Sequence, residues 1–244
     1  MKKLKFTFKN AAGEELAGLL ELPENPKAFA LLAHCFTCGK DLKGAARIAR
    51  KLTENAIAVL RFDFTGLGNS EGDFSNTNFS SNISDLLCAV DYLRRQYEAP
   101  SLLIGHSLGG SAILSIAGEV PEAKAVVTIG SPGELTHVKR LFKDDVENIN
   151  QHGAYPVELA GRVFTLKKQM LDNIQEHKIA HKVFAMNKPL LIFHVLIEQA
   201  EKIFKAAKHP KSFISLGKAD HLLTHAQDAE YVADIIISWS ECYL

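Results

Sequence analysis

One short motif in this chain could carry a nucleophile. Gly105-His106-Ser107-Leu108-Gly109 has the pattern G-x-S-x-G, follows the apolar run 101–104 and opens a helical pattern over 108–118. At a sharp turn from strand to helix, a serine takes a strained backbone conformation that exposes its hydroxyl. Glycines avoid collisions at such a turn, and the helix N-terminus stabilises negative charge. This context favours Ser107 as a nucleophile over an incidental serine in a glycine-rich turn.

A serine nucleophile needs a general base, and His221 is the best candidate. It follows the last apolar run, 212–216, and comes after Ser107 in the chain, the usual order of nucleophile and histidine behind such a motif. His34, His106 and His194 also stand at the ends of apolar runs. A single histidine at a strand end more often has a structural role, so these three are weaker candidates.

A parallel sheet is expected to position these residues. Segments 3–9 and 15–22 have strand patterns joined by a turn at 10–13, and the apolar runs that follow suit inner strands. The runs cover 28–33, 57–62, 101–104, 125–129, 189–193 and 212–216, and the helical patterns 41–54, 82–97, 108–118, 195–207 and 225–240. This alternation predicts an α/β fold with a mostly parallel central sheet of about eight strands and helices on both faces.

Residues 135–188 interrupt the alternation. They are richer in charge and histidine and contain no run of the inner-strand kind; 155–164 resembles a small hairpin and 165–178 a helix. We expect one domain over 1–244, with 135–188 as a cap inserted over the sheet edge where open α/β sheets bind ligands. A bulky crossover without ligand contact is the alternative.

The composition excludes several classes of protein. In 244 residues, 28 Lys and Arg balance 28 Asp and Glu, which is a poor match for nucleic acid or an anionic membrane surface. The residues are 47% hydrophobic, yet no apolar run approaches the roughly 18 residues that span a bilayer. The basic start alternates apolar and polar residues, unlike a secretion signal, and four Cys give no disulfide framework. We therefore expect a cytoplasmic protein.

The sequence resembles the α/β-hydrolases. It is most similar to the esterase-like domain of bacterial proteins in which that domain precedes an OsmC-like hydroperoxide reductase, and more distantly to feruloyl (cinnamoyl) esterases. The matching stretches are spread over the chain: 33–38 (AHCFTC), 61–72 (RFDFTGLGNSEG), 105–110 (GHSLGG), 206–213 (AAKHPKSF) and 219–221 (ADH). The resemblance implies the α/β-hydrolase fold. It also implies that the backbone amides of Phe36 and Leu108 form an oxyanion hole, while Asp63 reads as a structural loop residue.

The catalytic acid of that family is missing from its expected place. In the family a loop with Pro and Asp follows the strand that matches 190–194, whereas here His194 runs directly into the helical pattern from Val195. Because no turn residue separates them, we expect a gap or a disordered loop at this junction. Glu198 and Glu134 are weak substitutes for the acid; Asp220 adjoins His221, but neighbouring side chains there tend to diverge.

Two other groups of residues offer rival chemistry. Cys35-Phe36-Thr37-Cys38 is a C-x-x-C between a strand and a helix, as in thiol redox sites. We expect two buried or inert thiols instead, because the chain is long for a thioredoxin-type fold and the motif coincides with the proposed oxyanion loop. Cys88 and Cys242 lie on helical patterns and read as core. The pairs His177/His181 and His221/His225 have the helical spacing of metal ligands, but no further ligand completes either set.

The sequence thus predicts a serine hydrolase of the carboxylesterase type. It would cleave a small or medium carboxylic ester through an acyl-enzyme on Ser107, with a small-molecule ester as its partner and no metal or organic cofactor. Thioester cleavage and acyl transfer use the same groups, and the natural substrate and oligomeric state stay open. The alternatives are a catalytically weak or dead hydrolase scaffold, favoured by the missing acid, and a C-x-x-C thiol redox protein.

Overall fold

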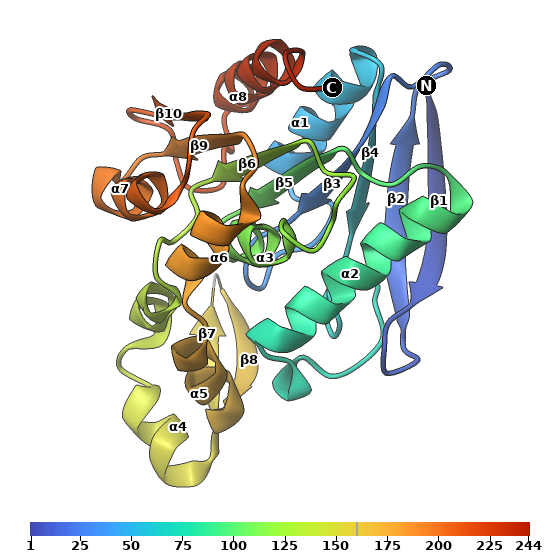
Figure 1. The fold of residues 1–244 in the computed structure, drawn as a ribbon. Coiled ribbons are helices and arrows are strands. Elements are labelled where there is room, and N and C mark those ends of the chain that lie inside the picture. Colours follow the sequence, from blue (N-terminus) through green and yellow to red (C-terminus); the bar gives the residue numbers. More distant parts are fainter. Residues whose placement is uncertain (160) are drawn as a thin grey trace.

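Short apolar runs of the chain form an eight-stranded sheet with the order β1-β2-β4-β3-β5-β6-β9-β10 (Figure 1). The structure is a computed structural model that describes residues 1–159 and 161–244. The strands of this sheet are β1 (Lys2–Lys9), β2 (Glu15–Leu22), β3 (Ala28–Ala33), β4 (Ile57–Phe62), β5 (Leu102–His106), β6 (Ala125–Ile129), β9 (Leu190–His194) and β10 (Lys211–Ser215).

The inner part of the sheet is parallel. Strands β4, β3, β5, β6, β9 and β10 run in one direction, whereas β1 and β2 form an antiparallel hairpin whose second strand pairs with β4. In the register, Ile104 of β5 lies between Leu32 of β3 and Val127 of β6. The prediction of a mostly parallel α/β sheet of this size is confirmed.

Helices cover both faces of the sheet, because the inner strands are apolar on both sides. The helices of these layers are α1 (Lys43–Glu54), α2 (Phe79–Gln96), α3 (Leu108–Ile116), α6 (Ile179–Met186), α7 (Ile197–Ala206) and α8 (Ala226–Ser240). α1 and α8 pack together on one face, and α2 and α3 lie on the other (Figure 1).

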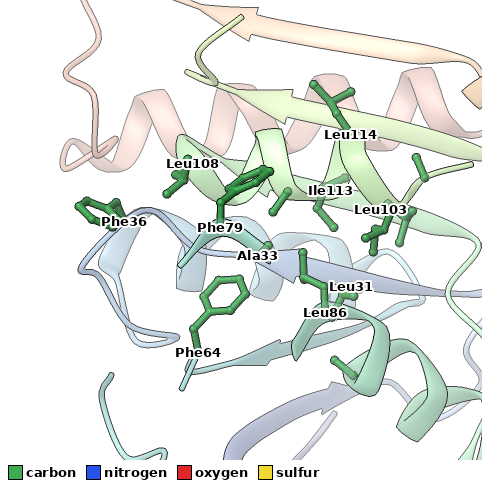
Figure 2. Packing of buried hydrophobic residues seen from close by; sticks show 14 of the residues in the cluster. Leu31, Ala33, Phe36, Phe64, Phe79, Leu86, Leu103, Leu108, Ile113 and Leu114 are labelled. Carbon is green, nitrogen blue, oxygen red and sulfur yellow. The ribbon is translucent and has the colours of Figure 1, made fainter. Parts of the chain in front are cut away.

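Successive side chains along a strand point to opposite faces of the sheet, so they pack in different hydrophobic clusters. Leu32 and Ile104 pack in the cluster beneath α1 and α8, whereas Leu31 and Leu103 belong to the cluster beneath α2 and α3 (Figure 2). All four are buried, and full burial of such a side chain contributes about 1.5–3 kcal/mol. This packing gives β3 and β5, whose ends carry the candidate site, a rigid support.

The segment predicted as a cap folds into several short elements. After η2 (Leu135–Phe142) come α4 (Val146–His152), the hairpin of β7 (Ala154–Leu159) and β8 (Arg162–Lys167), and α5 (Lys168–Glu176). The hairpin and α5 correspond to the predicted hairpin and helix, although α5 begins later than expected. The last helix of the segment, α6, packs against α3 and α7, so this part belongs to the helical layer on the sheet.

None of the helices in the described ranges is long and apolar enough to cross a membrane.

Candidate active site

Ser107 forms the turn between β5 and α3. Its backbone takes φ 54° and ψ −126°, and its amide donates to the carbonyl of Ile129 on β6 at 2.8 Å. A non-glycine residue with positive φ persists only where its surroundings hold it there, and such residues cluster at functional sites. The turn leaves the Ser107 side chain partly exposed at the N-terminus of α3.

Two glycines of the motif have no room for a side chain. A Cβ on Gly105 would lie 2.3 Å from the Gly110 Cα, and a Cβ on Gly109 would lie 2.2 Å from the His34 carbonyl oxygen. These neighbours are backbone atoms beside β3 and in α3, which cannot move without disturbing the sheet. The spacing of the glycines in the sequence is therefore a steric requirement of the turn.

The structure brings His221 to Ser107. His221 lies in the loop after β10, and its Nε2 is 3.0 Å from the Ser107 Oγ. Burial lowers the pKa of His221, and the charge of Asp220 opposes that shift. A lowered pKa favours the neutral ring, whose Nε2 can accept the serine proton.

The loop around His221 is held by its backbone and by its neighbours. The Asp220 carboxylate accepts hydrogen bonds from the Leu222 amide at 2.9 Å, and from the Thr224 amide and hydroxyl at 3.0 and 2.6 Å. The Nε2 of His106 donates to the His221 carbonyl at 2.6 Å. Burial first of all lowers the pKa of His106 to about 4, so this ring is neutral and carries its one proton on Nε2.

The two backbone amides that the sequence suggested for an oxyanion hole are free to donate. Within the described residues, neither the Phe36 amide nor the Leu108 amide hydrogen-bonds to another protein group. Leu108 follows Ser107 directly, and Phe36 lies in the loop after β3. Two such donors can stabilise an oxyanion on a carbon attached to the serine oxygen.

The loop that holds Phe36 is pinned from the hairpin β7–β8. The Arg162 guanidinium donates to the Thr37 carbonyl, and the guanidinium carbon lies 5.0 Å from the centroid of the Phe164 ring. The Phe164 ring contacts that of Phe74 at a centroid distance of 4.8 Å, and Phe74 contacts Phe36 at 5.7 Å. Side chains of the hairpin thus cover this side of the site.

Neither acid suggested by the sequence reaches His221. Among the described residues, no carboxylate hydrogen-bonds to the His221 ring. Glu134 instead pairs with Lys202 at 2.8 Å, and Glu198 is exposed in the first turn of α7. Glu198 and Glu134, the weak candidates for the acid, therefore do not contact His221 in this structure, because both side chains are exposed at the surface. The carboxylate of Asp220 is bound to Thr224.

Comparison with known proteins identifies the family. A family model described as serine aminopeptidase, S33, matches residues 24–238. The chain belongs to this family of α/β-hydrolases. The esterase domain of a Rhodothermus marinus protein is 44% identical, with a TM-score of 0.79 over 100% of this chain and 99% of that one.

More distant relatives of this α/β-hydrolase share its fold. Est1E from Butyrivibrio proteoclasticus, solved with ferulic acid, has a TM-score of 0.82 at 21% identity over 98% of both chains. Mitochondrial palmitoyl-protein thioesterase ABHD10 from Bos taurus is 26% identical over 144 residues, which are 56% of this chain and 46% of that protein. The chain thus spans less than half the length of the curated relatives that it matches first.

The junction after β9 of this α/β-hydrolase is continuous, so the predicted gap or disordered loop is wrong. β9 ends at His194, and only Val195 and Leu196 precede α7. The Leu196 amide donates to the His194 Nδ1 at 2.8 Å. The histidine side chain thereby supplies the acceptor that a turn-forming residue usually provides.

The two cysteines beside Phe36 form a disulfide. The Cys35 and Cys38 Cα atoms are 5.3 Å apart, and the Cys38 amide donates to the Cys35 carbonyl at 3.2 Å. The expectation of two inert thiols is therefore wrong, since the turn brings both sulfurs together. Thr37, inside the turn, has φ 57°. Of the other cysteines, Cys242 is exposed in the structure, which corrects its assignment to the core.

A buried network of charged groups, which was not predicted from the sequence, also holds the loop that carries Phe36. The Asp63 carboxylate accepts from the Lys40 amide and Nζ, each at 2.6 Å, and from the Asn69 amide at 2.9 Å. A Cβ on Gly68 would lie 2.3 Å from the Asp63 Cγ. Asp63 thus has the structural position that the sequence suggested, and its partner Lys40 was identifiable only by its place just after the C-x-x-C.

The remaining histidines bind other groups. His34 is buried, with its Nδ1 donating to the Cys35 carbonyl at 2.8 Å, and burial lowers its pKa. His177 bonds to the Ser80 hydroxyl at 2.9 Å. No cluster of three or more His, Cys, Asp or Glu with the geometry of a metal site occurs in 1–159 or 161–244.

Proposed function

We propose that this α/β-hydrolase is a serine carboxylesterase in which Ser107 is the nucleophile and His221 the general base. The observation that carries the proposal is the 3.0 Å contact between the Ser107 Oγ and the His221 Nε2. It occurs at a serine held at φ 54°, and the two amides proposed for the oxyanion hole have no acceptor within the described residues. A nucleophile, a base and two donors for an oxyanion are the parts that acyl transfer needs.

The reaction would proceed in two steps. The His221 Nε2 takes the Ser107 proton while Oγ attacks the ester carbonyl carbon, and the oxyanion accepts from the Phe36 and Leu108 amides. The imidazolium then gives its proton to the leaving oxygen, the bond between carbonyl carbon and leaving oxygen breaks, and an acyl-enzyme remains. Water, deprotonated by His221, releases the acid by the same route.

The relatives support an ester or a thioester as substrate. The Rhodothermus marinus relative is described as an esterase domain, and ABHD10 as a palmitoyl-protein thioesterase. A thioester would pass through the same steps with a thiol as leaving group. We also propose that residues 135–188 act as the cap of this single domain, since Arg162 and Phe164 of the hairpin reach the loop that holds Phe36.

A weak enzyme or a binding scaffold is the second candidate. It is favoured by the ring of His221, which contacts no carboxylate in the described part of the chain. A histidine in the wrong orientation or tautomer typically lowers the rate by about 10⁴, while nucleophile and oxyanion hole still contribute. The proposal therefore predicts slow turnover that depends on both Ser107 and His221.

Labelling with a fluorophosphonate and hydrolysis of p-nitrophenyl butyrate test the proposal together. We expect the wild-type protein to be labelled, and Ser107→Ala to lose both labelling and turnover. The exposed Ser215→Ala is the matched control and should behave as the wild type. His221→Ala should slow both reactions, whereas the exposed His225→Ala should not. Turnover that persists in Ser107→Ala would refute the assignment, and a wild type that neither reacts nor turns over would favour the scaffold.

A further inference from the structure

A cavity of 190 Å³ opens beside the Ser107–His221 pair. Gly130 and His194 line it at the ends of β6 and β9, and its other walls come from η2 and the start of α7. Neither Phe36 nor Leu108, which carry the two free amides, is among its lining residues. The cavity therefore lies on the His221 side of Ser107, away from the candidate oxyanion hole.

The proposed reaction determines which part of an ester binds on the His221 side of Ser107. Once Oγ has attacked, the carbonyl oxygen must point at the Phe36 and Leu108 amides. The leaving oxygen must lie near the His221 Nε2, because that nitrogen returns the proton taken from Ser107. The group attached to the leaving oxygen then extends into the space beside His221. The rings of Phe36, Phe74 and Phe164 contact one another beside the loop that carries the Phe36 amide.

The walls of the cavity suit an apolar group. Pro132, Val138, Leu141 and Leu196 supply its apolar surface. Apart from Ser107 and His221, three polar side chains line the cavity. The Gln199 Oε1 accepts the Gly133 amide at 3.0 Å, and the His194 Nδ1 accepts the Leu196 amide. Burial lowers the pKa of His137, which favours its neutral ring.

Two apolar side chains at the mouth of this cavity are exposed to solvent. Leu141 is 61% exposed and Leu196 55%, so an apolar ligand seated between them would remove both from water. The direct junction of β9 with α7 places Leu196 at this mouth, where a longer loop would lie in the related family pattern.

The size of the cavity limits the group that it can hold. A dry protein cavity of about 150 Å³ holds one benzene molecule. At 190 Å³, this cavity accommodates one aromatic ring or a compact branched chain with a short linker. A long acyl chain would extend beyond these walls into solvent.

We infer that the cavity binds the leaving group, and that the substrates are short-chain acyl esters or thioesters of a ring-sized apolar alcohol or thiol. This inference rests on the proposed serine esterase function. Under this inference, η2 at residues 135–142 and the hairpin β7–β8 have different roles. η2 contacts the alcohol or thiol group of the substrate, and the hairpin covers the side that receives the acyl group.

Two ester series of similar alcohol reactivity test the inference. With acetate as the acyl group, 2-phenylethyl acetate should have a kcat/KM about tenfold above that of ethyl acetate. Leu141→Trp, which fills the mouth at an exposed position, should reduce this ratio about tenfold, and Leu141→Ala should lower it by a smaller factor. Val163→Trp on β8 is the control, since Val163 is also exposed and lies outside the cavity lining. It should leave the ratio unchanged.

A series of esters that differ in the acyl group tests the opposite arrangement, in which the cavity binds the acyl group. If Leu141→Trp instead changes the ratio between ethyl octanoate and ethyl acetate and leaves the alcohol series unaltered, the cavity binds the acyl group. That result would overturn the inference while the esterase function stands.

A binding measurement separates the cavity from catalysis. In Ser107→Ala protein, ligand-observed NMR should detect 2-phenylethanol, and adding Leu141→Trp should abolish the signal. Absence of binding, or binding that Leu141→Trp does not weaken, would overturn the inference. Turnover that survives in Ser107→Ala would refute the function instead.

Discussion

Ser107 and His221 lie 3.0 Å apart, yet the chain around each is built differently. Around Ser107, backbone atoms come so close that a Cβ on Gly105 or Gly109 would overlap them. Around His221 the packing is uneven: a Cβ on Gly44 would lie 2.5 Å from the Leu222 carbonyl oxygen, whereas four residues before His221 a Cβ on Gly217, at φ 58°, would meet no atom within 4 Å. His221 keeps part of its surface in solvent, although its ring, which meets Ser107, is buried enough for its pKa to be lowered.

This difference shows that the two groups owe their positions to different forces. Ser107 is held by steric exclusion between β3, β5 and α3. His221 is held by hydrogen bonds, one from His106 to its carbonyl and others that close the turn at Asp220, while the next residue, Leu222, packs against α1. Steric exclusion in a close-packed interior tolerates no change, whereas a hydrogen-bonded loop can shift at small cost.

The sharpest contrast is between alanine at Gly105 and alanine at Gly217. Gly105→Ala should destabilise the fold by more than about 4 kcal/mol, because its Cβ meets the Gly110 backbone at 2.3 Å. Gly217→Ala should cost only about 1 kcal/mol, the strain of a positive φ. Urea unfolding of both variants measures the difference. Equal losses would mean that the two sides are equally tightly packed.

The next largest loss of stability is expected when the buried charge of Asp63, which supports the Phe36 loop, is removed. Asp63→Asn leaves the buried Lys40 without its close partner and should cost about 3–4 kcal/mol. Adding Lys40→Met to Asp63→Asn should recover at least half of that loss, because neither charge of this pair then remains. Thermal and urea unfolding of the single and double variants checks this. A loss below about 1 kcal/mol in Asp63→Asn would show that the ion pair does not hold the loop.

His106, which hydrogen-bonds to the His221 carbonyl, should make the stability of the fold depend on pH. The pKa of His106 is about 4 in the folded protein, against about 6.5 for an unperturbed histidine. Its contribution is therefore fully present above about pH 6.5 and is lost as the pH falls toward 4, because the unfolded chain takes up the proton first.

This linkage predicts about 2–3 kcal/mol less stability at about pH 4.5 than at pH 7 from His106 alone. His106→Gln should flatten the pH profile of unfolding by that amount, and the exposed His181→Gln should leave it unaltered. An unchanged slope in His106→Gln would show that the ring is not kept neutral by the fold.

Loss of the disulfide in the Phe36 loop should change stability less than loss of the buried charge or protonation of His106. Replacing Cys35 and Cys38 by Ser opens a very short loop and should cost about 2 kcal/mol. Turnover of p-nitrophenyl butyrate should fall about tenfold, because the Phe36 amide lies between the two cysteines. Reduction of the wild type should have the same effect. Equal turnover with the disulfide formed and reduced, as verified by mass spectrometry, would separate the Cys pair from catalysis.

Much of the fold was predictable from the sequence. The apolar runs that became β3, β4, β5 and β6 indicate a buried parallel sheet, because strands apolar on both faces need helices on both sides. The short helices α4 and α6 were not predicted. Their patterns are weak, and they form because neighbouring elements bury Ile149 and Val183.

The candidate site was predictable only in part. Gly105 and Gly109 indicate Ser107, because few backbone arrangements require glycines at that spacing. The position of an acid could not be predicted, since it depends on where Glu134 and Glu198 point after folding, and Lys202 captures Glu134.

By itself, the sequence determined the strand-to-helix turn at Ser107 and the α/β layering, because both follow from local sterics and from the period of apolar residues. Only the tertiary structure decided that His221 meets Ser107, that Lys40 pairs with Asp63, and that Leu141 and Leu196 frame a cavity. These contacts join residues far apart in the chain. Their geometry comes from the order of the strands in the sheet, which no local pattern encodes.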